Sequence, residues 1–132
     1  RQADADQALQ LGIAIGDTLF YSQIVHYENN VPVQIEDRFV NPETAPDYLR
    51  QVLNKQTPYT YLMDIAPLTA GEHRVEAISA SDEQRHLLQL EEHEPCLLIH
   101  RRTWSGSRVV TSARLIYPGS RYQLFGRFTS HG

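Results

Sequence analysis

The sequence predicts an α+β domain, in which a central antiparallel sheet carries helices on one face. Two pairs of strand-like segments are each joined by a short turn, and such turns connect antiparallel neighbours. Helical segments stand around these pairs and do not alternate with single strands, which argues against a doubly wound parallel sheet. The chain has 132 residues, which allows one domain and leaves little room for a second.

Apolar spacing, caps and turn residues place the expected elements along the chain. Ser81 and Gln84 form a capping box, so we expect a helix to begin behind Ser81. Thr57 suits an N-cap, and Pro58 suits the first helical position, where its missing N–H costs nothing. In chain order we expect a helix in residues 1–11, strands 18–27 and 32–40, helices 42–53 and from 57, a strand 73–80, a helix behind 81, strands 96–104 and 108–117, and a last strand 122–129.

The length of the first hairpin loop decides which side chains share a face of the sheet. Asn29 and Asn30 tolerate the left-handed backbone that tight turns require. A turn on these two residues alone would point His26 away from Glu36. A three-residue loop, 28–30, would instead put both side chains on one face, and we expect this longer loop.

Composition bounds the partners of this chain. Lys and Arg total 12 against 16 Asp and Glu, giving a formal net charge of −4, whereas domains that bind a phosphate backbone usually have a basic excess. Direct DNA binding by this segment is therefore not expected. No apolar run approaches the ~18 residues of a membrane span, and the first residues lack a signal-peptide core. A single cysteine, Cys96, fits a reducing compartment, so we expect a cytoplasmic protein.

Common catalytic and metal-binding patterns are missing from the sequence. The six histidines have no i, i+4 pair of the kind found in metalloprotease helices, and one cysteine cannot build a zinc clip. No nucleophile elbow or glycine-rich phosphate loop is present. Cys96 follows a proline and precedes apolar residues, which favours a buried structural thiol. We therefore expect no metal and no cofactor.

Two kinds of polar residue suggest small-molecule binding. Glu36 and Glu76 lie in strand-like segments, where they either face inward as paired carboxylates or point to solvent. The helix start at Thr57 offers free backbone N–H groups, near the Tyr59 hydroxyl. This is either an anion site or an ordinary cap. The residues alone predict no more than a domain that binds a small molecule.

A series of short motifs resembles a known family in order and spacing. These motifs are DTLF at 17–20, NVPVQIE at 30–36, TPYTYL at 57–62, EAISA at 76–80, LIHRRTW at 98–104 and YPGSRY at 117–122. Together they resemble the UTRA domain, the effector-binding half of HutC-type GntR transcription regulators. The likeness covers nearly the whole chain, so residues 1–132 are expected to form one UTRA domain.

The resemblance implies a chorismate-lyase-like fold with a ligand cavity between the sheet and the helices. It also implies a homodimer, no enzymatic activity, and a winged helix-turn-helix before residue 1 that binds operator DNA. Many members of this family bind a small metabolite that releases operator DNA, so the resemblance implies such an effector. For a regulator of histidine degradation this effector is urocanate.

Positions of the family's pocket residues can be carried over one at a time. The hairpin glutamate falls at Glu36, and the strand arginine falls at Arg101, with Arg102 competing if the register slips. Sugar-phosphate-binding members have two arginines where this chain has Ile24 and His26, which argues against a phosphosugar. The expected effector-binding residues are His26, Glu36, Thr57, Tyr59, Arg101, Arg102, Thr111 and Tyr117.

The resemblance and the residue types together suggest how urocanate would bind. Its carboxylate would meet the helix start at Thr57 or one of the two arginines, through charge-assisted hydrogen bonds. Glu36 would accept the ring N–H, and Tyr59 or Tyr117 would stack on the ring. Two other functions stay open: a lyase acting on an aromatic acid such as chorismate, and a dimerisation module without a ligand.

Overall fold

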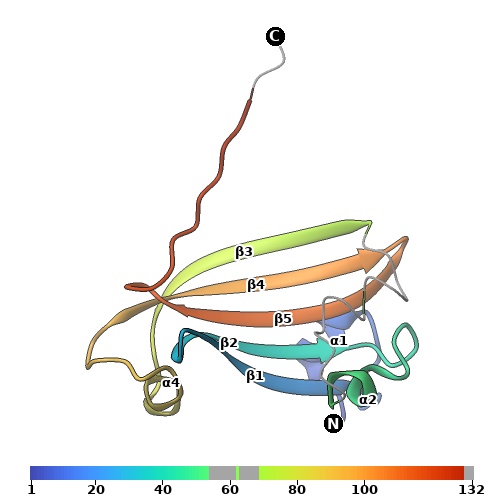
Figure 1. Ribbon diagram of the computed structural model, residues 1–132. Coiled ribbons are helices and arrows are strands. Elements are labelled where there is room, and N and C mark those ends of the chain that lie inside the picture. The colour runs from blue at the N-terminus through green and yellow to red at the C-terminus, as the bar shows by residue number, and fades with distance from the viewer. Residues whose placement is uncertain (54–61, 63–68, 130–132) are drawn as a thin grey trace.

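The computed structural model describes residues 1–53, 62 and 69–129 and contains a five-stranded antiparallel sheet (Figure 1). The strand order is β1-β2-β5-β4-β3, and every neighbouring pair is antiparallel. The elements are α1 (Ala5–Leu11), β1 (Phe20–Glu28), β2 (Val31–Val40), α2 (Tyr48–Leu53), β3 (Ala70–Ser79), α4 (Asp82–Leu88), β4 (Pro95–Ser105) and β5 (Arg108–Pro118). The expected α+β class with an antiparallel sheet is confirmed.

Helices α1 and α4 cover one face of the sheet at its two ends. Leu11 of α1 lies in a buried cluster that reaches Phe39 of β2, and Leu88 of α4 packs with Ile35 of the same strand. Both helices begin with a capping box, including the one expected at Ser81. The side chain of Tyr48, the first residue of α2, lies on the opposite face of the sheet from α1 and α4. The expectation that helices pack on one face of the sheet therefore holds for α1 and α4, whereas Tyr48 of α2 lies on the other face.

The boundary of α2 differs from the sequence-based expectation. A helix was expected over 42–53, but residues 42–47 form turns and the helix begins at Tyr48. Two prolines explain the late start, because Pro42 and Pro46 lack the N–H groups that a continuous helix would need. The helix expected from Thr57 lies outside the described residues.

The first hairpin turns on two residues, and a bulge restores the side-chain arrangement. Asn29 and Asn30 have φ values of 52° and 65°, as a tight hairpin turn requires. The expected three-residue loop is therefore wrong. His26 pairs with Gln34, but Tyr27 pairs with Pro32, so one extra residue stands in β2 between these pairs. Because of this bulge, His26 and Glu36 nevertheless share a face.

The second hairpin also has a shorter turn than expected. Ser105 pairs with Arg108, so the turn contains Gly106 and Ser107 alone. Gly106 has a φ of 61°, a left-handed conformation that glycine adopts without steric cost. The long β4–β5 ladder places Thr103 directly opposite Thr111. The β4–β5 ladder lies at the centre of the sheet.

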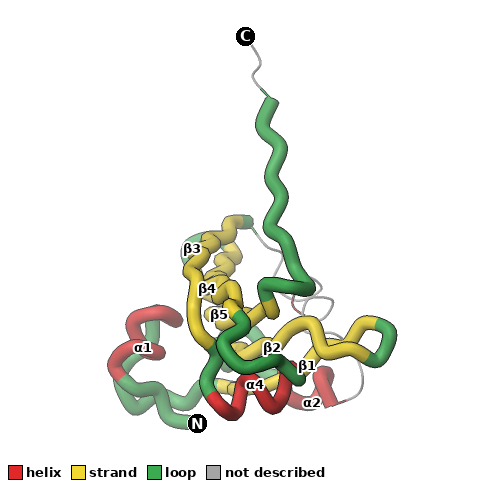
Figure 2. The backbone as a smooth tube through the Cα atoms, turned by 90° about the vertical axis from the view of Figure 1, so that its left-hand side faces the viewer, coloured by secondary structure: helices red, strands yellow, loops and turns green. Residues whose placement is uncertain are grey.

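Residues 122–129, which we call the tail, do not form the strand expected there. The tail has no regular secondary structure and runs away from the sheet past β3 (Figures 1 and 2). A strand needs a neighbour to hydrogen-bond with, and within the described part of this chain the tail pairs with no other strand. The expected sixth strand is therefore wrong for the single chain. Among the described residues, no helix has the length and apolar character needed to cross a membrane.

Candidate ligand-binding site

The register of the strands sorts the expected site residues between the two faces of the sheet. Residues directly opposite each other in an antiparallel pair point to the same side. Arg38 of β2 is thereby aligned with Ala113 of β5, Arg101 of β4 and His73 of β3. The expected residues that share the face of Arg38 are His26, Glu36, Arg101, Thr111 and Tyr117. We call this face the site face.

Three of the expected residues do not join this group. Arg102 lies on the opposite face, where it pairs with Glu72 at 3.2 Å and its guanidinium lies over the ring of Trp104. The register thus decides between the two adjacent arginines in favour of Arg101. Thr57 and Tyr59 lie outside the described residues.

A buried carboxylate forms the centre of the site face. The side chain of Glu36 is 8% exposed, and so is that of Arg38, which donates from Nε to Oε2 at 3.1 Å. His26 Nε2 lies 3.2 Å from Oε1 of Glu36. Burial raises the pKa of Glu36, but the hydrogen bond from His26 and the charge and hydrogen bond of Arg38 outweigh it and lower the pKa to about 2. Glu36 is therefore ionised, and His26 donates to it.

Hydroxyl groups extend this cluster along the sheet. Arg38 donates to Thr111 Oγ1 at 3.4 Å, and Thr111 lies 2.8 Å from the hydroxyl oxygen of Thr103. Thr111 is completely buried. Sequence reasoning did not single out Arg38, although the Glu-x-Arg spacing within a strand places both side chains on one face. That spacing was the signal that could have identified it.

Arg101 is held by a histidine from the edge strand. Its Nε donates to Nε2 of His73 at 2.7 Å, so this histidine is neutral when the hydrogen bond forms. Burial and the charge of Arg101 both lower the pKa of His73. Within the described residues Arg101 forms no ion pair with a carboxylate, and its two terminal nitrogens have no described hydrogen-bond partner. His73 was also not identified from the sequence.

An aromatic pair borders the other end of the site face. Tyr117 and Tyr122 are stacked, with ring centroids 3.8 Å apart and planes 15° apart. Gln34 donates to the Tyr117 hydroxyl at 2.9 Å, and burial raises the pKa of that phenol. Ile99 and Leu115 lie between this pair and Arg101 and form an apolar floor. The site face thus combines buried apolar side chains, a fixed anion, and a cation that pairs with none of the described carboxylates.

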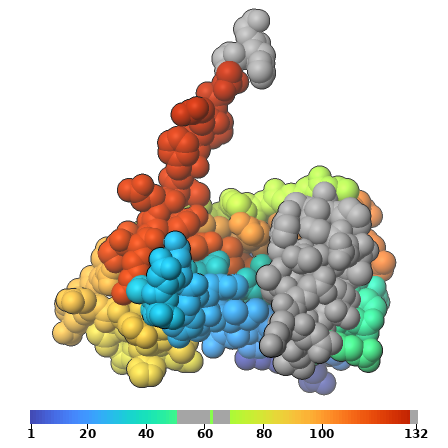
Figure 3. Space-filling view, in the orientation of Figure 1, coloured from blue at the N-terminus to red at the C-terminus, as the bar shows by residue number. Residues whose placement is uncertain are grey.

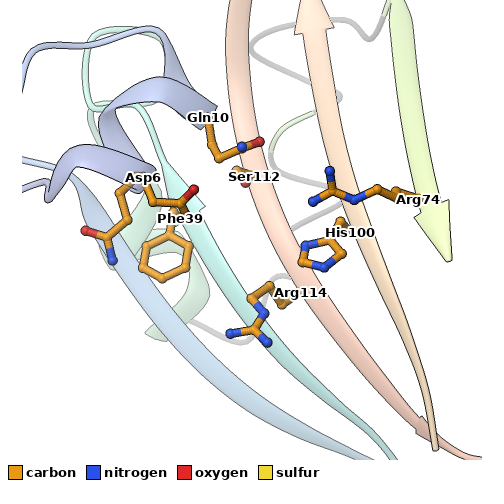
Figure 4. A pocket seen from close by; sticks show the side chains of 8 residues that line it. Asp6, Gln10, Phe39, Arg74, His100, Ser112 and Arg114 are labelled. Carbon is orange, nitrogen blue, oxygen red and sulfur yellow. The ribbon is translucent and has the colours of Figure 1, made fainter. Parts of the chain in front are cut away.

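A cavity of about 130 Å³ lies on the opposite face, beneath α1, and not on the site face (Figure 4). Its lining includes Arg74, His100 and Arg114 from three adjacent strands. Glu76 belongs to this face: it is half exposed and its Oε1 lies 2.7 Å from His100 Nε2. Glu76 is thus separated from Glu36 by the sheet. Nowhere in the described residues do three or more His, Cys, Asp or Glu side chains gather as a metal ion would require.

The family model of the UTRA domain matches residues 1–123. The chain belongs to the UTRA family. The site face described above is thus a face of a UTRA domain, and the resemblance drawn from the motifs is confirmed.

Relatives of this UTRA domain include named repressors. It is 61% identical over 127 residues to the histidine utilization repressor of Pseudomonas putida, covering 96% of this chain and 51% of that protein. The C-terminal domain of the histidine utilization repressor from Pseudomonas syringae pv. tomato str. DC3000 has a solved structure, which is 58% identical with a TM-score of 0.92. That match covers 98% of this chain and 92% of the other.

A more distant structure shows the same fold. The ligand-binding domain of a putative GntR-family regulator from Bordetella bronchiseptica has a TM-score of 0.88 at 20% identity, with coverage of 98% and 84%. The chain spans about half the length of the curated relatives that it matches.

Proposed function

We propose that this UTRA domain is the ligand-sensing part of a transcriptional repressor of histidine utilization, and that its effector is urocanate. The similarity to repressors of that name supports the regulatory role. The observation that carries the choice of ligand is the ionised, buried Glu36 on the same face as Arg101. The domain acts by binding and not by catalysis, and it works in the cytoplasm, where the operator is.

The chemistry of urocanate matches the groups on the site face. Urocanate is flat and joins an imidazole ring to a carboxylate through a short unsaturated arm. Glu36 can accept the ring N–H, because each carboxylate oxygen keeps a free lone pair beside its present hydrogen bond. The terminal nitrogens of Arg101 can bind the carboxylate as a fork. Burying either charged group of the ligand without such a partner would cost several kcal/mol.

The distance between the strands is comparable with the length of a ligand of this size. Glu36 stands on β2 and Arg101 on β4, with β5 between them, so the two strands are about 10 Å apart. Leu115 and Ile99 lie along this span, and both are buried in a cluster with Tyr117 and Tyr122 against which a flat ring would pack. Tyr117 would border the ring. The roles assigned to Thr57 and Tyr59 from the sequence stay predictions.

Control of DNA binding requires parts beyond this chain. We propose that a winged helix-turn-helix on the same polypeptide binds the operator, since this domain has a net charge of −4. The full-length protein would act as a homodimer. Urocanate would shift that dimer between arrangements that do and do not present two DNA-reading domains at operator spacing.

Titration calorimetry of the domain tests the sensor proposal. Urocanate, histidine and glucose 6-phosphate require different charges from a site, so we expect heat of binding from urocanate and little from the other two. Incubation with chorismate, followed by chromatography, should show no conversion. Equal affinity for all three ligands, or turnover of chorismate, would contradict the proposal.

A further inference from the structure

A row of three basic side chains crosses the sheet beneath α1. Arg74 of β3 lies opposite His100 of β4, and His100 lies opposite Arg114 of β5. All three side chains line the cavity of about 130 Å³, and Figure 4 shows the His100 ring between the two guanidinium groups. The two guanidinium charges repel each other unless an anion lies between them. The row therefore favours a negatively charged occupant.

The carboxylates beside this row do not neutralise its two arginines. Oε1 of Glu76 lies 2.7 Å from Nε2 of His100. Asp37 of β2 lies opposite Arg114, but its Oδ1 accepts a hydrogen bond from the Tyr21 hydroxyl at 2.7 Å. Within the part of the chain that the structure describes, neither arginine of the row forms an ion pair with a carboxylate. An anionic ligand would supply the partner that these two side chains lack there.

The remaining lining of the cavity is polar on the α1 side and partly apolar on the sheet side. Gln10 of α1 lies beside Ser112 of β5, and Phe39 of β2 forms a wall (Figure 4). Amide and hydroxyl groups both donate hydrogen bonds, which an anion accepts. Asp6 of α1 also lines the cavity, and its charge opposes an anion. None of the described lining residues belongs to the tail, which stands clear of the body in the space-filling view (Figure 3).

We infer that the cavity beneath α1 binds a small dicarboxylate, with one carboxylate at Arg74 and the other at Arg114. A guanidinium binds a carboxylate through two parallel hydrogen bonds, so two separate guanidinium groups match two carboxylates. β3 and β5 lie about 10 Å apart with β4 between them, and both arginine side chains extend into that interval. The carbon chain of the ligand would pack against Phe39. The cavity is smaller than the sites of drug-sized ligands, which restricts the ligand to a few carbon atoms.

This site is separate from the one proposed for urocanate. Neighbouring residues of a strand point to opposite faces, so Arg74 and His100 lie on the other side of the sheet from His73 and Arg101. Both ligands can therefore be bound at the same time. The inference goes beyond the proposed function and does not rest on the identity of its effector.

Titration of the isotope-labelled chain with succinate, followed by amide proton–nitrogen correlation spectra, tests the site. The ionic strength is held constant with sodium chloride, because salt screens exposed charges. We expect saturable shifts at the amides of Arg74, His100 and Arg114 and in α1. Acetate and inorganic phosphate should each bind about 10-fold more weakly or less, because each presents one charged centre to one guanidinium.

Charge substitutions around the cavity should change succinate affinity in opposite directions. Arg74→Gln and Arg114→Gln should each weaken binding about 10- to 100-fold, as loss of a hydrogen bond to a charged group predicts. Asp6→Asn should strengthen binding about twofold or more, because it removes a negative charge from the lining. Arg102→Gln is the matched control: this arginine lies on the same face but pairs with Glu72, so the affinity should stay within about twofold. Circular dichroism of each variant shows whether it is folded.

Competition distinguishes this site from the site face. Saturating urocanate should not displace succinate, and Arg101→Gln should leave succinate affinity unchanged. The inference is overturned by an absence of saturable shifts, by phosphate binding more tightly than succinate, by shifts confined to the site face, or by an equal loss in Arg102→Gln. If urocanate fails to bind while succinate binds as expected, the sensor proposal fails and this inference stands. The reverse result leaves the sensor proposal standing.

Discussion

Arg38 donates its Nε to Oε2 of Glu36 at 3.1 Å from a position two residues further along the same strand. Both side chains are 8% exposed, so an ion pair lies on the interior side of the sheet. His26 and Thr111 add the hydrogen bonds that the two charges still need. A buried pair of this kind adds little net stability over apolar residues, but breaking it leaves a bare charge. Its presence therefore points to a use other than stability.

Replacing Arg38 by methionine should destabilise the domain by about 3 kcal/mol, because Glu36 is left buried without its cation. Urea unfolding followed by fluorescence or circular dichroism measures the change. Arg108→Met is the matched control: its ion pair with Glu43 is exposed, and such pairs contribute at most about 1 kcal/mol. Equal effects of the two substitutions would show that the Glu36–Arg38 pair is not desolvated.

Acid should destabilise the domain through Glu36. Its pKa falls from 4.5 to about 2 on folding, so the folded state binds the proton less tightly than the unfolded state. The stabilisation is complete above pH 4.5 and is lost as the pH falls toward 2, and it amounts to about 3 kcal/mol. Urea unfolding of wild type and Glu36→Gln between pH 7 and pH 3 should show a smaller pH dependence in the variant.

Features of neighbouring residues predicted most elements of the fold. The bulge in β2 and the pairing of each strand depend on contacts between residues far apart in the sequence. The capping box at Ser81 and the turn residues Asn29 and Asn30 are properties of adjacent residues, and the structure contains each of them. The bulge that aligns His26 with Glu36 depends on how β2 pairs with β1. The strand expected in the tail failed in the single chain because a strand pattern does not supply a partner.

The site was predictable where alternation along a strand sufficed. Thr111 and Tyr117 share parity on β5, and the structure places them on one face. The choice between Arg101 and Arg102 required the register of β4, which the sequence left open. His73 could not be found without knowing that β3 pairs with β4 at Arg101.

The first hairpin turn should respond to substitution at Asn30, whose φ is 65°. Glycine adopts this conformation without a side-chain penalty, so Asn30→Gly should stabilise the domain by about 0.5 kcal/mol. Asn30→Val should cost about 1–2 kcal/mol, since a β-branched residue is strained there. Thermal unfolding measures both changes. At a position with negative φ, we would not expect the glycine variant to be more stable than the valine variant. If Asn30→Val were more stable than Asn30→Gly, the turn geometry would be contradicted.

Arg101 and Arg102 should differ in their effect on urocanate binding, although they are adjacent. Arg101→Gln should weaken binding about 10- to 100-fold, as loss of a hydrogen bond to a charged group predicts. Arg102→Gln should leave the affinity within about twofold, because its side chain lies on the other face with Glu72. Calorimetry on both variants gives the comparison. If Arg102→Gln lost more affinity for urocanate than Arg101→Gln, the ligand would bind on the face opposite the site face.

Glu36 should control selectivity for the imidazole ring more than affinity for the carboxylate. Cinnamate has the same acid arm with a phenyl ring, which offers no N–H to Glu36. In wild type, urocanate should bind more tightly than cinnamate by about 10-fold or more, the worth of one hydrogen bond to a charged acceptor. Glu36→Ala should bring the two affinities within about threefold while cinnamate binding persists, because Arg101 still holds the carboxylate. Glu76→Ala serves as the control, because it removes a strand carboxylate from the opposite face of the sheet, and it should keep the selectivity of wild type. If Glu36→Ala binds urocanate as tightly as wild type does, the ring is recognised by another group.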